Sequence, residues 1–162
     1  MAYQKLQVSV ALRVIPSDYI NIPNPSEVNA SGRTTALGAG VSNLIDTNAT
    51  FTDGSIQVGN IVYDTRNSVV AKVTGIVNDN ELSLEDGNGV AVNLAAGADY
   101  VIYKDTNKAC VLYVGVSGDL TVRMANDGNQ VTFTAAPQGY QPIQVNRVLV
   151  SSTTATDIIA LW

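Results

Sequence analysis

Short runs of apolar or alternating residues, each followed by Gly, Asn, Asp or Pro, occupy most of this chain. The clearest run is residues 6–14, where Leu and Val side chains alternate with Gln7, Ser9, Ala11 and Arg13. A period of two is typical of a β-strand with one buried face. No window of useful length combines apolar residues at helical spacing with capping residues. The sequence therefore predicts an all-β protein.

The middle of the chain, residues 34–105, has the texture of a separate small β-domain. We expect strands at residues 56–58, 61–63, 69–77, 82–84, 90–94 and 100–103, spaced as in an antiparallel meander. Residues 78–80 and 86–89 are rich in Asn, Asp and Gly, which accept positive φ and favour hairpin turns. A short helical turn near residues 39–44 is also compatible with the sequence.

The C-terminal third predicts five more strands, at residues 111–116, 120–125, 131–135, 143–150 and 158–162. An isolated first strand at residues 6–14 is unstable and needs these strands as partners. The fold class that follows is an antiparallel β-sandwich host domain, jelly-roll-like, with an inserted small β-barrel or meander domain. We expect residues 1–33 and 106–162 to form the discontinuous sandwich and residues 34–105 to form the insertion.

Residues 15–33 should form an extended surface arm. Pro16, Pro23 and Pro25 interrupt it and cannot donate a backbone hydrogen bond to a strand ladder. Such an arm can lie on its own domain or clasp a neighbouring subunit, and the sequence leaves both open.

Charged residues make up only 14% of the chain while hydrophobic residues make up 46%, against about 25% charged residues in an ordinary soluble domain. A chain so poor in charge is expected to bury part of its exterior against other subunits. The alternative is an extracellular β-protein kept soluble by Thr, Ser and Asn. The net charge of -5 argues against a nucleic-acid partner, and no apolar run is long enough to span a bilayer. No signal peptide is apparent, so we expect synthesis in a cytoplasm.

Catalytic chemistry has few candidates. The chain has no histidine, which removes the usual general base. Carboxylate pairs such as Asp18 with Glu27 or Glu85 with Asp86 are conceivable, but acids in turns usually cap backbone amides. Residues 86–89 resemble a calcium loop only faintly and lack the remaining ligands. Cys110 lies among apolar residues and should be a small core residue. We expect no enzyme activity, metal or cofactor.

Loop aromatics and the proline-rich arm are better candidates for contacts between subunits, because Tyr combines apolar area with a polar tip. Recognition of a sugar by such aromatics is the competing interpretation. A terminal tryptophan after an apolar strand should be held in a core or between subunits. The interface candidates are Tyr19, Ile22, Pro23, Pro25, Tyr140 and Trp162.

Several segments resemble the head spike base family of gene transfer agents and related tailed-phage virion proteins. They are residues 110–126 (CVLYVGVSGDLTVRMAN), 131–134 (VTFT), 142–149 (PIQVNRVL), 153–162 (TTATDIIALW), and the arm motifs 16–18 (PSD) and 23–25 (PNP). The resemblance covers both ends of the chain, residues 1–33 and 107–162. It departs from the family in the middle, because short members pass almost directly from the arm to the Leu-Tyr-Val-Gly strand.

The resemblance implies a virion structural protein on the phage head. It would decorate or cement the capsid as a symmetric homo-oligomer, with a trimer favoured over a pentamer, or form the base of a head spike. The sandwich would contact the major capsid protein and residues 34–105 would face outward, with neither nucleic acid nor membrane as a partner. The alternative function is a receptor- or glycan-binding module of a phage fibre or tail.

Overall fold

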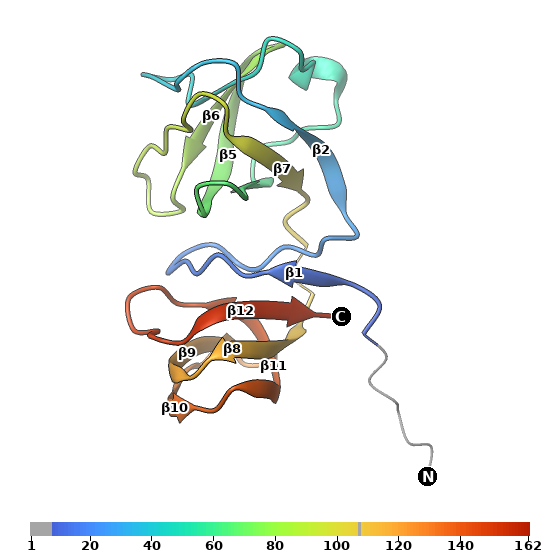
Figure 1. Ribbon diagram of the computed structural model, residues 1–162. Coiled ribbons are helices and arrows are strands. Elements are labelled where there is room, and N and C mark those ends of the chain that lie inside the picture. Colours follow the sequence, from blue (N-terminus) through green and yellow to red (C-terminus); the bar gives the residue numbers. More distant parts are fainter. Residues whose placement is uncertain (1–7, 107) are drawn as a thin grey trace.

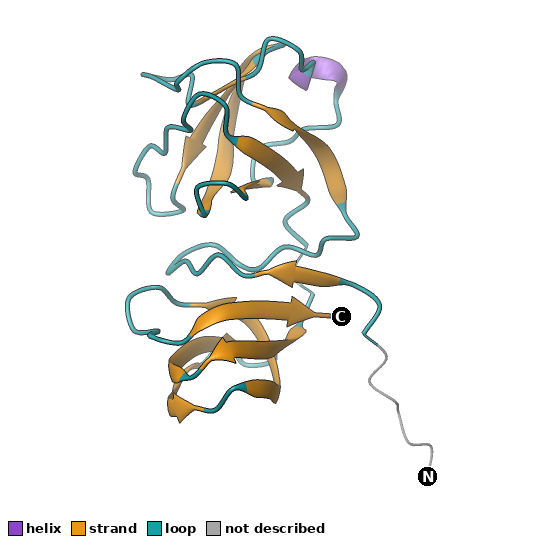
Figure 2. Ribbon diagram, in the orientation of Figure 1, coloured by secondary structure: helices purple, strands orange, loops and turns teal. Residues whose placement is uncertain are grey.

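The computed structural model describes residues 8–106 and 108–162, and almost all of its regular structure is β (Figure 2). The strands form two antiparallel six-stranded sheets, stacked end to end as two lobes (Figure 1). We call the described residues before Val28 and after Asp105 the sandwich lobe, and residues 28–105 the barrel lobe. The predicted fold class, a β-sandwich with a small barrel-like insertion, is confirmed. No helix in the described residues is long and apolar enough to cross a membrane.

The sandwich lobe has the strand order β1-β12-β8-β11-β9-β10. Its strands are β1 (Ala11–Arg13), β8 (Cys110–Val116), β9 (Gly118–Met124), β10 (Gln130–Ala136), β11 (Gly139–Val148) and β12 (Thr156–Leu161). All of their pairings are antiparallel. The expected pairing of the first strand with the C-terminal set is therefore observed, since β1 pairs with β12.

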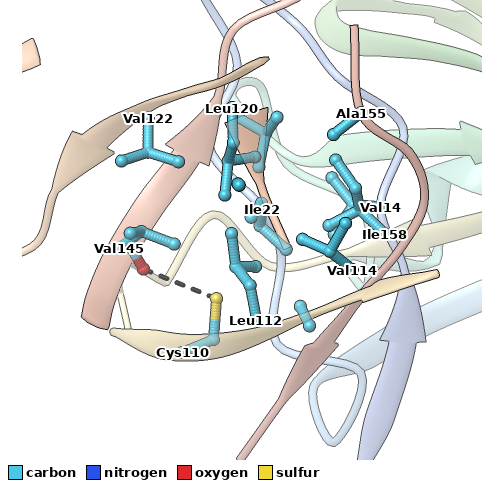
Figure 3. Close-up of a cluster of buried hydrophobic side chains, with 13 residues drawn as sticks. Val14, Ile22, Cys110, Leu112, Val114, Leu120, Val122, Val145, Ala155 and Ile158 are labelled. Carbon is cyan, nitrogen blue, oxygen red and sulfur yellow. Dashed lines mark hydrogen bonds between the residues drawn. The ribbon is translucent and has the colours of Figure 1, made fainter. Parts of the chain in front are cut away.

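Strand β11 connects the two layers of this sheet. Its first half pairs with β8, its second half pairs with β9, and the register shifts between residues 141 and 145. Such a shift lets one strand pass from one layer of a sandwich to the other. The two layers enclose a core that includes Leu112, Leu120 and Val145, each fully buried (Figure 3).

The barrel lobe has the strand order β2-β7-β4-β5-β6-β3. Its elements are β2 (Val28–Arg33), β3 (Leu44–Ile45), a 3-10 turn η1 (Phe51–Asp53), β4 (Ile61–Asp64), β5 (Val69–Asn78), β6 (Glu81–Glu85) and β7 (Asp99–Tyr103). The sheet curls until the residues after β2 reach β3, where Ala36 forms a bridge with Ile45. This bridge links the two edges of the sheet, so the curled lobe approaches a closed barrel.

A buried hydrogen bond supports the barrel core. The Tyr100 hydroxyl donates to Asp46 Oδ2 over 2.7 Å, and both residues are almost completely buried. The Phe51 ring lies 6.3 Å from the Tyr100 ring, within the range of favourable aromatic pairs. Gly32 makes room for this arrangement, because a Cβ there would lie 2.5 Å from the Tyr100 hydroxyl oxygen.

A third apolar cluster joins the lobes. Ile20 from the arm packs with Ile61, Tyr63 and Tyr103 from the barrel lobe, and Leu12 of β1 packs against them. The Tyr63 and Tyr103 rings meet edge to face, with centroids 5.7 Å apart. The two lobes are thus held by side chains as well as by the chain itself.

The chain crosses between the lobes twice, and the two crossings are bonded to each other. Lys104 N donates to Glu27 O over 3.0 Å, and the Lys108 ammonium pairs with the Glu27 carboxylate. The hydrogen bond from Lys108 holds the pKa of Glu27 below its ordinary value. Entry to and exit from the barrel lobe are therefore adjacent.

The arm lies on its own sandwich lobe. Ser17 N donates to Val148 O and Ile22 N to Asn146 O, over 2.9 and 2.8 Å. The Arg147 guanidinium also donates to the Asp18 carbonyl and to Asn21 Oδ1. Of the two arrangements that the sequence left open, the single chain adopts the first.

Several local predictions differ from the structure. The domain boundary expected after residue 33 lies before Val28, because β2 pairs with β7 of the barrel lobe. Residues 56–58 form no strand, since they enter a turn in which Gln57 N donates to Asn60 Oδ1 and Gly59 has a φ of 96°. Residues 90–94 contribute only one bridge, Glu85 to Ala91, and residues 39–44 are not helical. Of the first predicted strand, residues 6–7 lie outside the described residues.

Candidate interaction surface

The predicted interface residues do not form one surface. Tyr140 and Tyr19 are exposed, by 63% and 47%, but they lie in different places. Tyr140 is in β11, whereas Tyr19 lies against Gly87 of the barrel lobe. Pro25 and Trp162 are half-buried, and the Trp162 indole donates to Lys108 O over 3.3 Å. Ile22 and Pro23 are buried, and Ile22 fills the sandwich core of its own chain (Figure 3).

Tyr140 belongs to a row of side chains across four strands of the sandwich lobe. Arg13 pairs with Ile159, Ile159 with Tyr113, and Tyr113 with Tyr140. Directly paired residues lie on the same face of a sheet, and this face is opposite the core that Leu112 and Ala160 fill. The Tyr113 and Tyr140 rings meet edge to face at 5.5 Å. The row forms a largely apolar outer face, with its single charge, Arg13, paired to Asp157 over 3.5 Å.

The same lobe carries a long stretch without charge. Residues 128–146, here called the uncharged segment, contain no Asp, Glu, Lys or Arg. They form β10, its connection to β11 and most of β11. Most of their side chains through Gln144 are exposed or half-buried. An exposed surface of this length without charge is typical of a contact with another protein.

The sandwich sheet ends in two edge strands, β1 and β10, and β10 is the edge that belongs to the uncharged segment. It pairs with β9 on one side, from Gln130 to Phe133. Among residues 8–106 and 108–162, no strand pairs with its other side. Val131, Thr132 and Thr134 are exposed, and Phe133 packs partly against the core. An unpaired edge presents free backbone donors and acceptors, to which a further strand can bind.

The net charge is divided unequally between the lobes. Residues 28–105 contain four basic and nine acidic residues, whereas residues 1–27 and 106–162 contain five of each. The barrel lobe therefore carries a net charge of -5, whereas the sandwich lobe is nearly neutral, with four basic and five acidic residues among its described residues. This division and the uncharged segment were missed in the sequence analysis, although both can be read from the residues.

Three of the four carboxylates considered for catalysis, Asp18, Glu27 and Asp86, have partners elsewhere in the chain. Asp18 accepts from Ser151, and Asp86 accepts from the backbone of Asn88 and Val90. Glu27 binds Lys108, so the pair Asp18 and Glu27 shares no site. No three Asp, Glu or Cys residues in the described part of the chain lie close enough to hold a metal ion.

Cys110 is a core residue, as the sequence suggested. Its side chain is buried, and its thiol donates to Val145 O over 3.4 Å (Figure 3). Burial raises the pKa of the Cys110 thiol to about 12. A thiol that stays protonated at neutral pH is a poor nucleophile.

A polar groove of about 710 Å³ lies beside β2 and the second crossing. Amide side chains of Asn29, Gln57 and Asn60 line it, together with Lys104 and Asp105. Two of these amides are bonded to each other, since Asn29 donates to Asn60 over 2.8 Å. The groove offers hydrogen-bonding groups to a polar ligand, but no aromatic side chain lines it.

No protein-family model, curated protein or solved structure matches this chain.

Proposed function

We propose that this chain is a structural protein of a tailed-phage-like head. It decorates or cements the capsid as a symmetric homo-oligomer, with a trimer favoured over a pentamer, or forms the base of a head spike. The observation that carries the proposal is the contrast between a nearly neutral sandwich lobe with an exposed uncharged segment and a barrel lobe with a net charge of -5. The resemblance of residues 110–126 and 153–162 to virion proteins agrees with this division.

In the proposed mechanism, the nearly neutral sandwich lobe contacts the major capsid protein and neighbouring copies. Apolar and backbone contacts there need no charge partner, so a flat sheet face suits them. The acidic barrel lobe points outward, where its charge keeps the particle soluble and prevents particles from associating. Each contact is weak alone, but symmetric repetition over the capsid multiplies the affinity.

The test removes the protein from heads of the virus that encodes it and adds purified protein back. Heads without the protein should burst at a lower temperature than intact heads. When the ionic strength is lowered, they should also burst sooner than intact heads, and added protein should restore their resistance. A Tyr140→Glu variant places a charge on the outer face and should bind heads more weakly. Val41→Glu, at a 70% exposed barrel position, is the matched control and should bind normally. Normal head stability without the protein contradicts the cementing role, and no binding to heads contradicts every role proposed.

The polar groove supports a second candidate, a glycan-binding module, because its amide groups can exchange hydrogen bonds with sugar hydroxyls. A glycan array probed with the intact protein tests it. Binding that disappears in Asn29→Ala and Gln57→Ala, but not in Tyr140→Glu, would support the glycan function over the capsid role.

A further inference from the structure

We infer that the open edge of β10 is where a second copy of this chain binds, by antiparallel pairing of two β10 strands about a two-fold axis. The inference rests on the proposed function only in assuming that copies of the chain associate. It adds which strand makes the contact, which partner occupies it, and how the copies are related.

The edge is suited to receive a strand. Natural sheets usually protect an open edge with charged side chains or proline, and β10 contains neither. From Gln130 to Phe133 it keeps regular register with β9, so its outer side is a straight ladder of free backbone groups. Val131 and Thr132 are exposed on this ladder and favour β structure.

The charge distribution identifies the occupant as a second copy. Two identical molecules, each with a net charge of -5, repel each other unless they meet where neither carries charge. The uncharged segment is such a place along β10 itself, and the charged residues beside it, Arg123 and Asp119, belong to the neighbouring strand β9. In a two-fold contact each strand faces its own sequence, so a single charge on β10 would be set against its copy. A strongly acidic or basic partner would find no complementary charge on this edge.

A bulge fixes the length of the contact. The register with β9 shifts between Phe133 and Ala136, where Ala135 has a φ of 50°. Ala135 N turns to Asp119 Oδ1, to which it donates over 2.8 Å. The straight edge therefore ends at Phe133, and two copies can pair over Gln130–Phe133. So short a pairing is weak by itself, and its strength on a particle comes from repetition.

A two-fold contact joins copies in pairs, whatever other symmetry they have. A protein that associates only through β10 forms a dimer in solution. If a three-fold ring also forms, β10 pairs join two rings into a hexamer. On a capsid, the same pairing would bridge neighbouring oligomers.

The experiment measures the mass of the purified full chain over a range of concentrations, by light scattering and by native mass spectrometry. We expect the wild-type protein to reach an even number of copies as concentration rises. Val131→Lys places a charge at the centre of the Gln130–Phe133 contact, where Val131 lies opposite Thr132 of the copy and next to the same charge on the neighbouring strand. It should halve the largest assembly or weaken the pairing by about tenfold or more. Val41→Lys makes the same exchange on the barrel lobe and should leave the mass unchanged.

A second variant, Thr132→Lys, also lies within the Gln130–Phe133 contact and guards against loss of packing at residue 131. Both edge variants should keep the circular dichroism spectrum and melting temperature of the Val41→Lys protein within about 3 °C. An assembly whose mass is unchanged in both edge variants overturns the inference, as does a wild-type monomer at every concentration. The proposed function survives either result if the protein still binds and stabilises heads, and fails independently if it does not.

Discussion

The sandwich lobe and the barrel lobe treat the edges of their sheets in opposite ways. In the barrel lobe, the chain beyond β2 returns to β3, and the bridge from Ala36 to Ile45 links the two edges. In the sandwich lobe, β10 ends the sheet with one side unpaired among the described residues. The charge follows the same division, since the linked lobe is acidic and the open lobe nearly neutral. A chain with few ionic groups thus concentrates its net charge on the lobe whose sheet edges are linked.

The two lobes also differ in what their polar groups do. In the barrel lobe, buried Asp46, Asp64 and Asn43 hold loops through hydrogen bonds to backbone and side chains. In the sandwich lobe the buried polar groups are fewer, and Thr121 and Asn146 hold the loop and the arm that cover the sheet. Buried polar groups thus hold the loops of the barrel lobe, whereas the sandwich lobe keeps a free edge and an apolar outer face.

The largest expected effect comes from breaking the cluster between the lobes. Tyr63→Ala removes a fully buried ring and should lower the free energy of unfolding by about 3–5 kcal/mol. Calorimetry should then resolve separate transitions for the two lobes. Tyr140→Ala is the control, because it removes a ring with a similar edge-to-face partner from an exposed position. Similar losses for both variants would show that the lobes are not coupled through Tyr63.

The second-largest effect is expected at alkaline pH, which should lower the free energy of unfolding. Burial raises the pKa of Tyr63 and of Tyr100 above the ordinary value for tyrosine, and raises that of Cys110 to about 12. The unfolded chain releases these protons near pH 8.5–10, whereas the folded chain keeps them. Stability is therefore complete below that range and falls as pH rises through it. The slope should be about 1.4 kcal/mol per pH unit for each group.

Denaturant unfolding at pH 7 to 11, with tyrosinate absorbance to follow ionisation, measures this loss. Cys110→Ala removes the contribution of the sandwich core and leaves that of the buried tyrosines of the barrel lobe, Tyr63, Tyr100 and Tyr103. The variant should lose less stability with pH than the wild-type protein. A free energy of unfolding that stays constant up to pH 11 would contradict the burial of these groups.

A smaller effect is expected where the loop after β6 touches the arm. Gly87 and Gly89 have nearly equal positive φ, 87° and 86°. A Cβ at residue 87 would lie 2.9 Å from Tyr19 Cβ, whereas one at residue 89 meets nothing within 4 Å. Gly89→Ala should cost about 1–2 kcal/mol through backbone strain alone. Gly87→Ala should cost about 1 kcal/mol more, and equal melting temperatures would mean that the loop and arm do not touch.

The smallest effect concerns the ion pair at the second crossing. Lys72 of β5 binds Asp105 over 2.9 Å, and about a third of each side chain is exposed. Lys72→Met should lower the free energy of unfolding by less than about 1 kcal/mol. The difference from wild type should shrink further in 0.5 M salt, because the pair is partly screened. A larger loss of unfolding free energy would show that the ion pair holds the second crossing in position.

Patterns within a few residues predicted much of this fold. Alternation located the strands of the sandwich lobe after residue 107, and residues 78–80 form the expected turn between β5 and β6. The pairing of β1 with β12 also followed from residues alone, since a first strand without local partners has to pair with distant ones. These features depend on side-chain period and turn chemistry, which are local.

The predictions that were wrong concern residues whose structure depends on partners distant in the sequence. Val28–Arg33 has mixed polarity and becomes a strand because β7 lies beside it, so the sequence assigned it to the arm. Val58 has strand propensity but lies in a turn, where it is 67% exposed. Of the candidate interface residues, Ile22 and Pro23 are buried on their own lobe, because the arm folds back onto β11. The edge formed by β10 could not be located without the strand order.

The paired crossings have a consequence for how such a chain can change. Glu27 O and Lys104 N are only 3.0 Å apart, so the two segments that connect the barrel lobe to the sandwich lobe lie as close together as the strands of a hairpin. Deleting the barrel lobe and joining the two connecting segments with a tight turn would leave the hydrogen bonds of the sandwich lobe intact, provided that another side chain covered Ile20. Unrelated domains could be inserted between the same two segments, and the sandwich lobe would then display them.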